Sequence, residues 1–575
     1  MNYQETYDFW LNSDYFDEAT KQELRAITDD NEIKERFYKE LEFGTAGLRG
    51  VLGAGTNRMN IYTVGKATQG FATYLLESTE IDHSQGVALA YDPRHMSPEF
   101  AQAAALVFNA NGIKTYIYDG LRPTPQLSYT VRKLGCAGGV MVTASHNPPE
   151  YNGYKVYGPD GAQVMSPYDD QIISYVNNTD ITAVKTMSLA DAKTAGLYHI
   201  IDSSLDQAFQ SECLANVINP EIIKVHGDLP LVYTPLHGAG HLPTLNLLKT
   251  AGFTNVHVVA SQAAPDGNFP TVKFPNPEEA DVYELGKQLA ETIGAQVVFA
   301  SDPDADRVGI VSRDKAGNWY KLNGNQTGVM LTHYVLSQLK AQGKLPTHPA
   351  VITSIVSSKM THAIAAAHDV ACYDVFTGFK HIGELIKKWE TTQAHTFVYG
   401  FEESYGYLFR DYARDKDAIG VALLVAEIAA YCQGRGITLP EYLSEMYAQY
   451  GFYKEETIAL TLKGIAGLEK ISRIMDYFTD HVPATIGGVT VTHYRNYKTS
   501  TDTVLATGET TAIDFPKSNV RAFTLTDGSW ICVRPSGTEP KLKLYIGVNG
   551  ASETAAETQL KQLADSLMAL VDTVS

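Results

Sequence analysis

Three aspartates, Asp302, Asp304 and Asp306, stand at alternate positions in the segment ASDPDADRVGIV. Carboxylates this close repel one another, so the cluster favours a cation that neutralises it and uses its lone pairs. The segment does not fit an EF-hand loop, because Arg307 and Arg313 stand where that loop needs glycine and glutamate. Hard oxygen ligands after an apolar strand predict a Mg²⁺-type site. The alternative is a solvated acidic turn.

A serine and a histidine follow a small apolar run in VMVTASHNPPEYNGYK. If that run is a strand of a parallel α/β sheet, Ser145 lies at its carboxyl end, where such sheets bind ligands. The alternative is a plain turn, since Ser, Asn and Pro all favour turns. A catalytic pair of Ser145 with His146 is disfavoured, because adjacent residues rarely aim their side chains at each other and no G-x-S-x-G elbow is present.

The loop VRPSGTEPKLKLY combines an arginine with hydroxyls and a glycine: Arg534, Ser536, Gly537 and Thr538. An arginine fork, hydroxyl donors and freely exposed backbone N–H groups suit a phosphate dianion. The loop is therefore a candidate phosphate site, and a plain hairpin loop is the alternative.

Polar side chains also stand at expected element ends in VYGFEESYGY and FTGFKHIGE. Glu402, Glu403 and Ser404 follow an expected strand and could hydrogen-bond vicinal sugar hydroxyls, although an exposed acidic loop has the same composition. Lys380 and His381 open an expected helix, where cations oppose the helix dipole. That conflict favours an anionic ligand nearby.

The glycine-rich segment EFGTAGLRGVLGAGTNRMN carries Arg49 and Arg58. It lacks the spacing of a nucleotide P-loop and follows no evident strand, so a mononucleotide site is not expected there.

Short apolar runs alternate with helical stretches from Gly44 onward, which predicts α/β layers with parallel strands. The alternation begins again at LPLVYTPLHGAG, continues through the expected helix PEEADVYELGKQLAETIG, and starts a third time at AVITSIVSS. After about Gly451, alternating Thr-rich strands, a D-G turn and a closing amphipathic helix predict a smaller α+β domain. The expected fold is thus three successive mixed α/β domains and an α+β C-terminal domain, at residues 1–205, 206–322, 323–452 and 453–575.

Length, charge and cysteines restrict the class of protein. A chain of 575 residues is too long for one core, and its net charge of -19 repels nucleic acids and anionic membranes while still allowing small anions. The five cysteines are scattered without any C-x-x-C pair, which predicts free buried thiols. The N-terminus lacks signal-peptide features, and the apolar run from Ile419 to Cys432 is short and contains Glu427, so a buried helix is expected. We predict a soluble cytoplasmic protein with no nucleic-acid or membrane partner.

Five motifs follow one another along the chain: the glycine and arginine loop, T-A-S-H-N-P, D-P-D-A-D-R, the Glu-Glu-Ser loop and R-P-S-G-T-E-P. Their order and wording resemble the phosphohexomutase superfamily, and specifically its phosphoglucomutases, from about Phe43 to Tyr545. The resemblance implies four domains around a central cleft, each supplying one loop. It also implies interconversion of glucose 1-phosphate and glucose 6-phosphate through a phosphoserine enzyme, with Mg²⁺ and with glucose 1,6-bisphosphate as intermediate and activator.

The resemblance also implies roles for single residues. Ser145 matches the phosphorylated serine; Asp302, Asp304 and Asp306 match the Mg²⁺ ligands, which an oxygen of the phosphate on Ser145 would complete. Arg307 would lie near the transferring phosphoryl group, and Lys155 is the leading candidate for general acid/base duty. The remaining implied residues are His146 and Arg49 at the reaction centre, Gly378, Lys380, Glu402 and Ser404 for the sugar, and Arg534, Ser536, Gly537 and Thr538 for the non-reacting phosphate.

The sugar loop departs from the common pattern, because Phe401 stands where many hexomutases carry glycine. Its Glu-Glu-Ser wording resembles glucose enzymes more than the Glu-Met-Ser of mannose-active relatives. Phe401, FGTAGLRG and NRMN are also similar to a branch with phosphopentomutase and glucose-1,6-bisphosphate synthase. These enzymes and phosphomannomutase remain alternatives. From other classes, a Mg²⁺-dependent sugar phosphatase would leave Ser145 without a role, and a non-catalytic sugar-phosphate sensor would not need the reactive residues.

Overall fold

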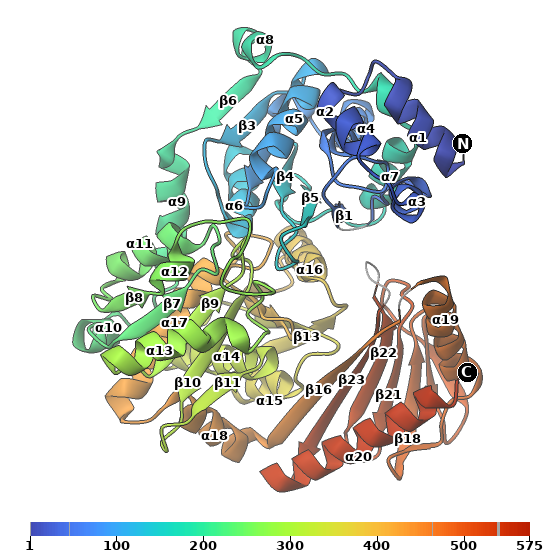
Figure 1. Ribbon diagram of the computed structural model, residues 1–575. Coiled ribbons are helices and arrows are strands. Elements are labelled where there is room, and N and C mark those ends of the chain that lie inside the picture. Colours follow the sequence, from blue (N-terminus) through green and yellow to red (C-terminus); the bar gives the residue numbers. More distant parts are fainter. Residues whose placement is uncertain (1, 45–46, 463, 537–540, 575) are drawn as a thin grey trace. The chain divides into compact units, whose positions relative to one another are not determined.

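The computed structural model describes residues 2–44, 47–462, 464–536 and 541–574 (Figure 1). These residues divide into two compact units, each described below by itself. The first unit comprises Met1–Gly324, Pro346–Pro349 and Gly378–Leu439, and the second comprises Asn325–Leu345, Ala350–Thr377 and Pro440–Ser575.

The first unit begins with three short helices, α1 (Tyr3–Asn12), α2 (Glu18–Arg25) and α3 (Asp30–Phe37). Asn2, Asp17 and Asp29 cap their N-termini with side-chain oxygens. The ring of Trp10 stacks on Phe16 with centroids 4.1 Å apart, and both rings contact Tyr62 of helix α4 (Ile61–Glu77). This aromatic cluster fixes the short helices to the domain that follows.

A six-stranded sheet in the order β1-β5-β4-β2-β3-β6 follows. Its strands are β1 (Leu48–Val51), β2 (Val87–Tyr91), β3 (Thr115–Tyr118), β4 (Gly138–Val142), β5 (Tyr151–Tyr157) and β6 (Tyr198–Ile201). Strands β2, β3, β4 and β6 are parallel, whereas β5 runs antiparallel to both β4 and β1. The accompanying helices are α5 (Ser97–Ala110), α6 (Thr124–Leu134), α7 (Tyr168–Asn178) and α8 (Leu189–Thr194), with 3-10 turns at His83–Gln85 and Ile181–Ala183.

Alternation of side chains along the strands divides this domain into two cores. Leu89 and Val140 pack with the rings of Phe71 and Phe108, from α4 and α5, on one face. The intervening Ala88, Ala90 and Met141 pack with Leu127 and Val131 of α6 on the other. The sheet is therefore covered on both faces (Figure 1), and the loop after β4 emerges at its carboxyl edge.

A five-stranded sheet in the order β11-β10-β9-β7-β8 forms the next domain. Its strands are β7 (Leu231–Thr234), β8 (Val256–Val258), β9 (Val297–Ser301), β10 (Val308–Arg313) and β11 (Trp319–Leu322). Strands β7, β8 and β9 are parallel, and β9, β10 and β11 form an antiparallel meander. Its helices are α9 (Ser203–Leu214), α10 (Pro220–His226), α11 (His241–Ala251), α12 (Ala260–Ala263) and α13 (Glu284–Ile293).

The helix expected over residues 277–294 is shorter than predicted. Only a 3-10 turn, Asp281–Tyr283, precedes α13, which begins at Glu284. The Asn276 side chain accepts a hydrogen bond from Glu278 N at 3.1 Å, and this turn aims the Glu278 carboxylate at Arg307, 2.7 Å away. A tertiary ion pair therefore overrides the local helical periodicity.

The first unit also contains α16 (Phe379–Thr392), the hairpin β14 (Thr396–Glu402) and β15 (Gly406–Phe409), and α17 (Ala418–Arg435). Helix α17 is the one helix among the described residues that is long and apolar enough to cross a membrane, and 78% of it is buried inside the protein. Its Glu427 carboxylate, 0% exposed, accepts hydrogen bonds from Ile218 N and Asn219 N at the start of α10. The prediction of a buried core helix is confirmed.

The second unit holds α14 (Gly324–Ala341), the parallel pair β12 (Pro349–Ser354) and β13 (Ala371–Val375), α15 (Met360–Ala367) and α18 (Leu439–Tyr450). An antiparallel sheet follows, in the order β16-β23-β22-β21-β18-β19-β20, with β17 paired to β18. Its strands are β16 (Phe452–Thr461), β17 (Thr485–Ile486), β18 (Val489–Asn496), β19 (Thr501–Val504), β20 (Glu509–Ala512), β21 (Arg521–Leu525), β22 (Trp530–Pro535) and β23 (Lys541–Gly550), accompanied by α19 (Gly464–Asp480) and α20 (Glu553–Asp572). The predicted multidomain α/β fold with an α+β C-terminal part is confirmed.

Burial predicts slow thiol chemistry. All five cysteines are free, and Cys136, Cys213, Cys432 and Cys532 are buried. Burial raises the pKa of Cys136 to about 12, so only about one thiol in 10⁴ ionises at about pH 8. We expect a thiol reagent such as dithionitrobenzoate to label the native protein slowly and all five cysteines rapidly in denaturant. Rapid labelling of Cys136 in the native protein would contradict this burial.

Removal of the Glu427 carboxylate should destabilise the first unit. Glu427→Ala leaves the N–H groups of Ile218 and Asn219 buried without that acceptor, at a cost of about 3 kcal/mol. We expect a lower thermal unfolding midpoint than in wild type, measured by circular dichroism. Glu150→Ala, at an exposed position, is the matched control and should unfold as wild type does.

Candidate active site

Ser145 lies at the carboxyl edge of the six-stranded sheet, three residues beyond Val142, the last residue of β4. Its φ of 52° is in the left-handed region, which is uncommon for a serine and costs about 1 kcal/mol or more. The side chain is 3% exposed, and its Oγ donates a hydrogen bond to Asp302 Oδ2 at 2.8 Å. The structure thus joins two motifs that lie 157 residues apart in sequence.

The premise that adjacent side chains rarely aim at each other does not hold for Ser145 and His146. Ser145 Oγ lies 3.1 Å from His146 Nδ1, within hydrogen-bonding distance. The left-handed backbone at Ser145 changes the direction of the chain, which allows adjacent side chains to converge. Burial and the nearby cations Arg307 and Arg49 lower the pKa of His146 well below its usual value, so the imidazole is neutral at physiological pH.

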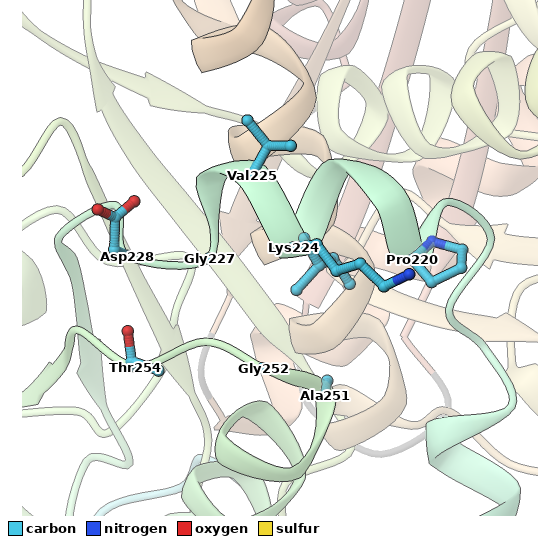
Figure 2. A pocket seen from close by; sticks show the side chains of 9 residues that line it. Pro220, Lys224, Val225, Gly227, Asp228, Ala251, Gly252 and Thr254 are labelled. Atoms are coloured by element: carbon cyan, nitrogen blue, oxygen red, sulfur yellow. The ribbon is translucent and has the colours of Figure 1, made fainter.

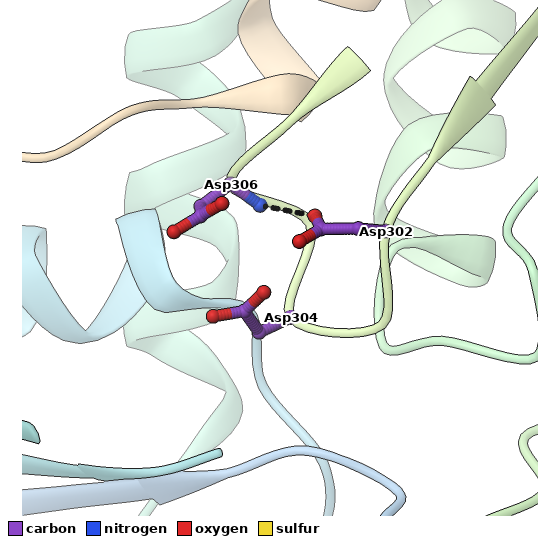
Figure 3. A group of neighbouring side chains, drawn as sticks. All are labelled: Asp302, Asp304 and Asp306. Carbon is purple, nitrogen blue, oxygen red and sulfur yellow. Dashed lines mark hydrogen bonds between the residues drawn. The ribbon is translucent and has the colours of Figure 1, made fainter. Parts of the chain in front are cut away.

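The three aspartates lie in the turn between β9 and β10, and all are buried. Figure 3 shows their carboxylates converging, with Asp306 N donating to Asp302 Oδ1 at 3.1 Å. One oxygen of each lies within 4.8 Å of the others. Burial, together with the charges of Asp304 and Asp306, raises the pKa of Asp302 well above its usual value. The raised pKa reflects the unfavourable free energy of placing three negative charges in one site shielded from water.

The cluster fits a divalent cation. Asp304 Oδ1 and Asp306 Oδ1 are buried without a hydrogen-bond partner, although buried carboxylate oxygens are normally satisfied. The other oxygen of Asp304 is occupied, because Thr124 Oγ1 and Lys155 Nζ both donate to Oδ2 at 2.8 Å. Free, hard oxygens at the centre of an acidic cluster are the donors that Mg²⁺ prefers.

Two lysines neutralise part of this charge. Lys155 of β5 lies 2.8 Å from Asp304 and 3.4 Å from Asp306, and Lys416 lies 3.1 Å from Asp306 and 3.0 Å from Asp415. Burial alone would lower the pKa of Lys155, but the charges of Asp304 and Asp306 outweigh it and raise that pKa. The pKa of Lys416 is likewise raised against its burial, chiefly by Asp306 and Asp415. Both ammonium groups are therefore charged.

Backbone hydrogen bonds hold the aspartate turn from three sides. Thr124 N, at the start of α6, donates to Asp304 O at 2.9 Å, and Ala418 N, at the start of α17, donates to Ala305 O at 3.1 Å. Val308 N donates to Tyr405 O in the turn between β14 and β15. The helix N-termini carry partial positive charge, so this arrangement also stabilises the carboxylates.

The predicted sugar loop lies beside this turn. Glu402 ends β14 and accepts a hydrogen bond from Gly378 N at 2.5 Å, just before α16. Its pKa is raised by burial, and the charge of Lys416 partly opposes this. Lys380, in the first turn of α16, has a pKa lowered by burial and lies 3.9 Å from Asp169. Ser404 lies in the turn itself and is partly exposed.

Two arginines that the sequence predicts at the site, Arg307 and Arg49, form an ion pair and a hydrogen bond with other side chains. Arg307 Nη1 lies 2.7 Å from Glu278 Oε1, and its Nε lies 3.8 Å from Asp306. Arg49 lies on β1, a strand that the glycine-rich sequence does not predict, and its Nη1 donates to Asn147 Oδ1 at 3.3 Å. Both guanidinium groups thus border the loops that carry Ser145 and the aspartates.

The predicted phosphate loop belongs to the second unit. Arg534 lies near the end of β22, and Ser536 N donates to Lys541 O at 2.7 Å across the start of β23. Gly537 and Thr538 lie outside the described residues.

Sequence reasoning missed Lys416 and Thr124. Lys416 lies in the charged run ARDKDA, and Thr124 in the segment RPTP. Neither run has a spacing that marks a site by itself. A Cβ at Gly406 would lie 2.0 Å from Lys416 Cδ, so the glycine of ESYGY is required for the lysine to reach Asp306. That glycine was the one usable signal.

A separate pocket lies beside α10 and the turn after α11 (Figure 2). Its charged side chains are Lys224 and Asp228, and none of the predicted site residues that the structure describes lines it.

Four family models match the chain, and all are described as phosphoglucomutase/phosphomannomutase domains. The alpha/beta/alpha domains I, II and III match residues 40–182, 211–317 and 323–450, and the C-terminal domain matches residues 495–566. A protein of Staphylococcus epidermidis named phosphoglucomutase is 37% identical over 540 residues, which cover 94% of this chain and 96% of that protein. The chain therefore belongs to the phosphoglucomutase/phosphomannomutase family. It is an enzyme, a phosphotransferase of the isomerase class.

Solved structures are similar in fold. The open form of the Paramecium exocytosis-sensitive phosphoprotein pp63/parafusin, a phosphoglucomutase, has a TM-score of 0.67 at 18% identity and covers 93% of this chain and 95% of its own. The N-acetylphosphoglucosamine mutase of Aspergillus fumigatus, in complex with GlcNAc-6P and magnesium, has a TM-score of 0.50 at 16% identity and covers 92% of this chain and 96% of its own.

Loss of one free carboxylate oxygen should weaken metal binding. Asp304→Asn removes a charge and replaces a ligand, so we expect the affinity for Mn²⁺, a spectroscopic substitute for Mg²⁺, to fall by about 10-fold or more. Electron paramagnetic resonance of free Mn²⁺ measures this without any activity assay. Asp281→Asn, an exposed aspartate, is the control and should bind as wild type does. Equal affinity in both variants would exclude Asp304 as a ligand.

Proposed function

We propose that the chain is an α-D-phosphoglucomutase that interconverts glucose 1-phosphate and glucose 6-phosphate. In this proposal Ser145 carries the phosphoryl group, and glucose 1,6-bisphosphate is both intermediate and activator. The observation that carries the proposal is the 2.8 Å hydrogen bond between Ser145 Oγ and Asp302 Oδ2. It brings a strained serine to a buried acidic cluster with two free oxygens, as phosphoryl transfer assisted by a metal requires.

In the proposed first step, the oxygen of the free sugar hydroxyl forms a bond to phosphorus while the bond from phosphorus to Ser145 Oγ breaks. The sugar hydroxyl loses its proton, and Ser145 Oγ gains one. The bisphosphate then turns, its other phosphoryl group passes back to Ser145, and the isomeric monophosphate leaves. Serine and sugar each return to their original number of phosphates over one cycle.

The residues around Ser145 supply charge and proton transfer in this scheme. Lys155 is held in its protonated form by Asp304 and Asp306, so we assign it as the general acid. His146 is neutral and lies 3.1 Å from Ser145 Oγ, so it can accept the proton that Ser145 loses when the bisphosphate returns a phosphoryl group to it. Arg307 would exchange part of its pairing with Glu278 for the phosphoryl oxygens.

Asp302, Asp304 and Asp306 would hold Mg²⁺, and an oxygen of the phosphate on Ser145 would complete the set. When bound, the ion supplies Lewis-acid neutralisation of charge on the phosphoryl oxygens. We assign Glu402 and Ser404 to the sugar hydroxyls, with Gly378, Lys380 and Arg49 lining the same side. Arg534, Ser536, Gly537 and Thr538 are proposed to bind the non-reacting phosphate.

The identity of residue 401 does not indicate which sugar phosphate the enzyme prefers, because Phe401 is buried. Its side chain is 0% exposed and lies between Tyr399 and Tyr407 of the same hairpin, with ring centroids 6.1 and 6.2 Å away. It therefore offers no surface to a substrate. The Glu-Glu-Ser wording and the staphylococcal relative support glucose over mannose and ribose.

The four domains are proposed at residues 1–205, 206–322, 323–452 and 453–575. Each of the four family matches falls inside one of these ranges, which supports the boundaries. A sugar phosphate is the expected partner, and the cytoplasm is the proposed location.

The activity can be tested in a coupled dehydrogenase assay on glucose 1-phosphate with catalytic glucose 1,6-bisphosphate. We expect Ser145→Ala to lower turnover by about 10³-fold or more, because the variant lacks the proposed phosphoryl carrier. Ser174→Ala, an exposed serine of α7, is the matched control. Peptide mass spectrometry should find phosphate on Ser145 both in wild type and in Ser174→Ala. Full activity in Ser145→Ala would refute the mechanism.

The same assay separates the alternatives. Faster turnover of mannose 1-phosphate or ribose 1-phosphate would replace the sugar assignment with phosphomannomutase or phosphopentomutase. Net formation of glucose 1,6-bisphosphate would indicate a bisphosphate synthase. Rapid release of inorganic phosphate would favour a sugar phosphatase instead.

A further inference from the structure

The guanidinium of Arg94 lies beneath the serine loop and is 1% exposed. It donates through Nη2 to Ser145 O at 2.6 Å and to Asn147 O, and through Nη1 to Pro148 O at 2.8 Å and Tyr151 O at 3.1 Å. Four carbonyl oxygens of one loop therefore converge on a single side chain. Without the guanidinium, the buried carbonyl of Ser145 would lose this donor, and Pro148 O would keep the hydrogen bond from Tyr151 N at 3.1 Å.

Only an arginine matches this arrangement. A guanidinium presents five N–H donors in a rigid, planar fork and stays charged when buried, whereas a lysine presents one compact ammonium. The pairs of carbonyls at Nη1 and Nη2 are therefore held in fixed directions, which also fixes the peptide plane that follows Ser145.

The N–H side of Ser145 is held by the same assembly. Ser145 N donates to Thr143 Oγ1 at 2.8 Å, and Thr143 Oγ1 donates to Asp92 Oδ2 at 2.6 Å. Asp92 Oδ2 lies 3.3 Å from Arg94 Nε, and Asp92 Oδ1 accepts from Arg94 N and Ser97 Oγ. The segment from Asp92 to Arg94 thus holds both backbone groups of Ser145: the N–H through Thr143, and the carbonyl directly through Arg94.

This assembly is shielded from water. The ring of Phe269 lies 4.9 Å from the guanidinium carbon of Arg94, and Phe269 is 1% exposed. Asp92 is 0% exposed and Thr143 is 1% exposed. Hydrogen bonds in such a dry setting are stronger and more restrictive in direction than exposed ones.

We propose that Arg94, with Asp92 as its counter-ion, is a positioning residue that holds the left-handed backbone of Ser145 so that Oγ faces the aspartate cluster. The inference rests on the proposed function of Ser145 as phosphoryl carrier. A left-handed backbone is disfavoured for serine, so contacts from outside the loop are needed to maintain this conformation. Arg94 touches no reacting atom; it acts through the main chain of the loop.

The test compares Arg94→Lys with wild type and with Arg521→Lys. Arg521 is also buried, at 2% exposure, and bonds Thr479 in the second unit, so this control tests the cost of losing any buried guanidinium. Three quantities are measured: the rate at which glucose 1,6-bisphosphate phosphorylates Ser145, the KM for glucose 1-phosphate, and amide hydrogen exchange of the peptide 143–151.

We expect Arg94→Lys to slow phosphorylation of Ser145 and turnover about 100-fold, as small misplacements of a reacting group do, with KM changed by less than about 3-fold. Exchange in 143–151 should rise while the rest of the protein exchanges as before. Arg521→Lys should leave the phosphorylation rate and the exchange of 143–151 unchanged. If Arg94→Lys does not fold, Thr143→Val against Thr143→Ser serves the same purpose, since only the valine removes the acceptor of Ser145 N.

A folded Arg94→Lys variant that is phosphorylated as fast as wild type overturns the inference, whether or not loop exchange has risen. The same holds for Thr143→Val if it is phosphorylated as fast as Thr143→Ser. A wild-type protein that never carries phosphate on Ser145 overturns the proposed function and, with it, this inference. If wild type is phosphorylated normally on Ser145 and the Arg94→Lys variant is phosphorylated as fast, only the inference about Arg94 is overturned and the proposed function stands.

Discussion

Three carboxylates, those of Asp302, Asp304 and Asp306, are buried in one turn, and the surrounding structure has to compensate the repulsion among them. Uncompensated, their mutual repulsion would oppose folding. Lys155 and Lys416 provide two charges, and the starts of α6 and α17 provide N–H groups directed at the same turn. Two oxygens still remain free. The fold thus supplies enough positive charge to tolerate the cluster and leaves room for a divalent ion to complete it.

The loops around the cluster share a backbone feature. Ser145, Ala305 and Tyr405 all have φ between 51° and 66°, in the left-handed region that residues with a Cβ avoid. Such conformations persist where hydrogen bonds over-determine them. Arg94 and Thr143 do so for Ser145, Ala418 N bonds Ala305 O, and Val308 N bonds Tyr405 O. Strain and charge are therefore concentrated in one place and are held by contacts from several separate segments.

Much of this could be predicted from local patterns. Strand alternation and turn residues predicted β4, β9 and β14, and hence the positions of Ser145, the aspartates and Glu402 at strand ends. Predictions failed where long-range contacts overrode local ones. Glu278 leaves the expected helix to pair with Arg307, and the turned backbone at Ser145 brings His146 to a hydroxyl it was not expected to meet. Lys416 has no local signal, because its role depends on a glycine ten residues before it.

The sequence by itself determined which chemical groups are present and which strand end each one follows, because periodicity and turn chemistry act over a few residues. It also determined the family, through the order of five motifs. Only the tertiary structure decided which groups meet. The contact of Ser145 with Asp302, the convergence of four carbonyls on Arg94 and the burial of Phe401 all join or hide residues through packing of distant segments. Distances of this kind arise from the whole fold, and no short stretch of sequence encodes them.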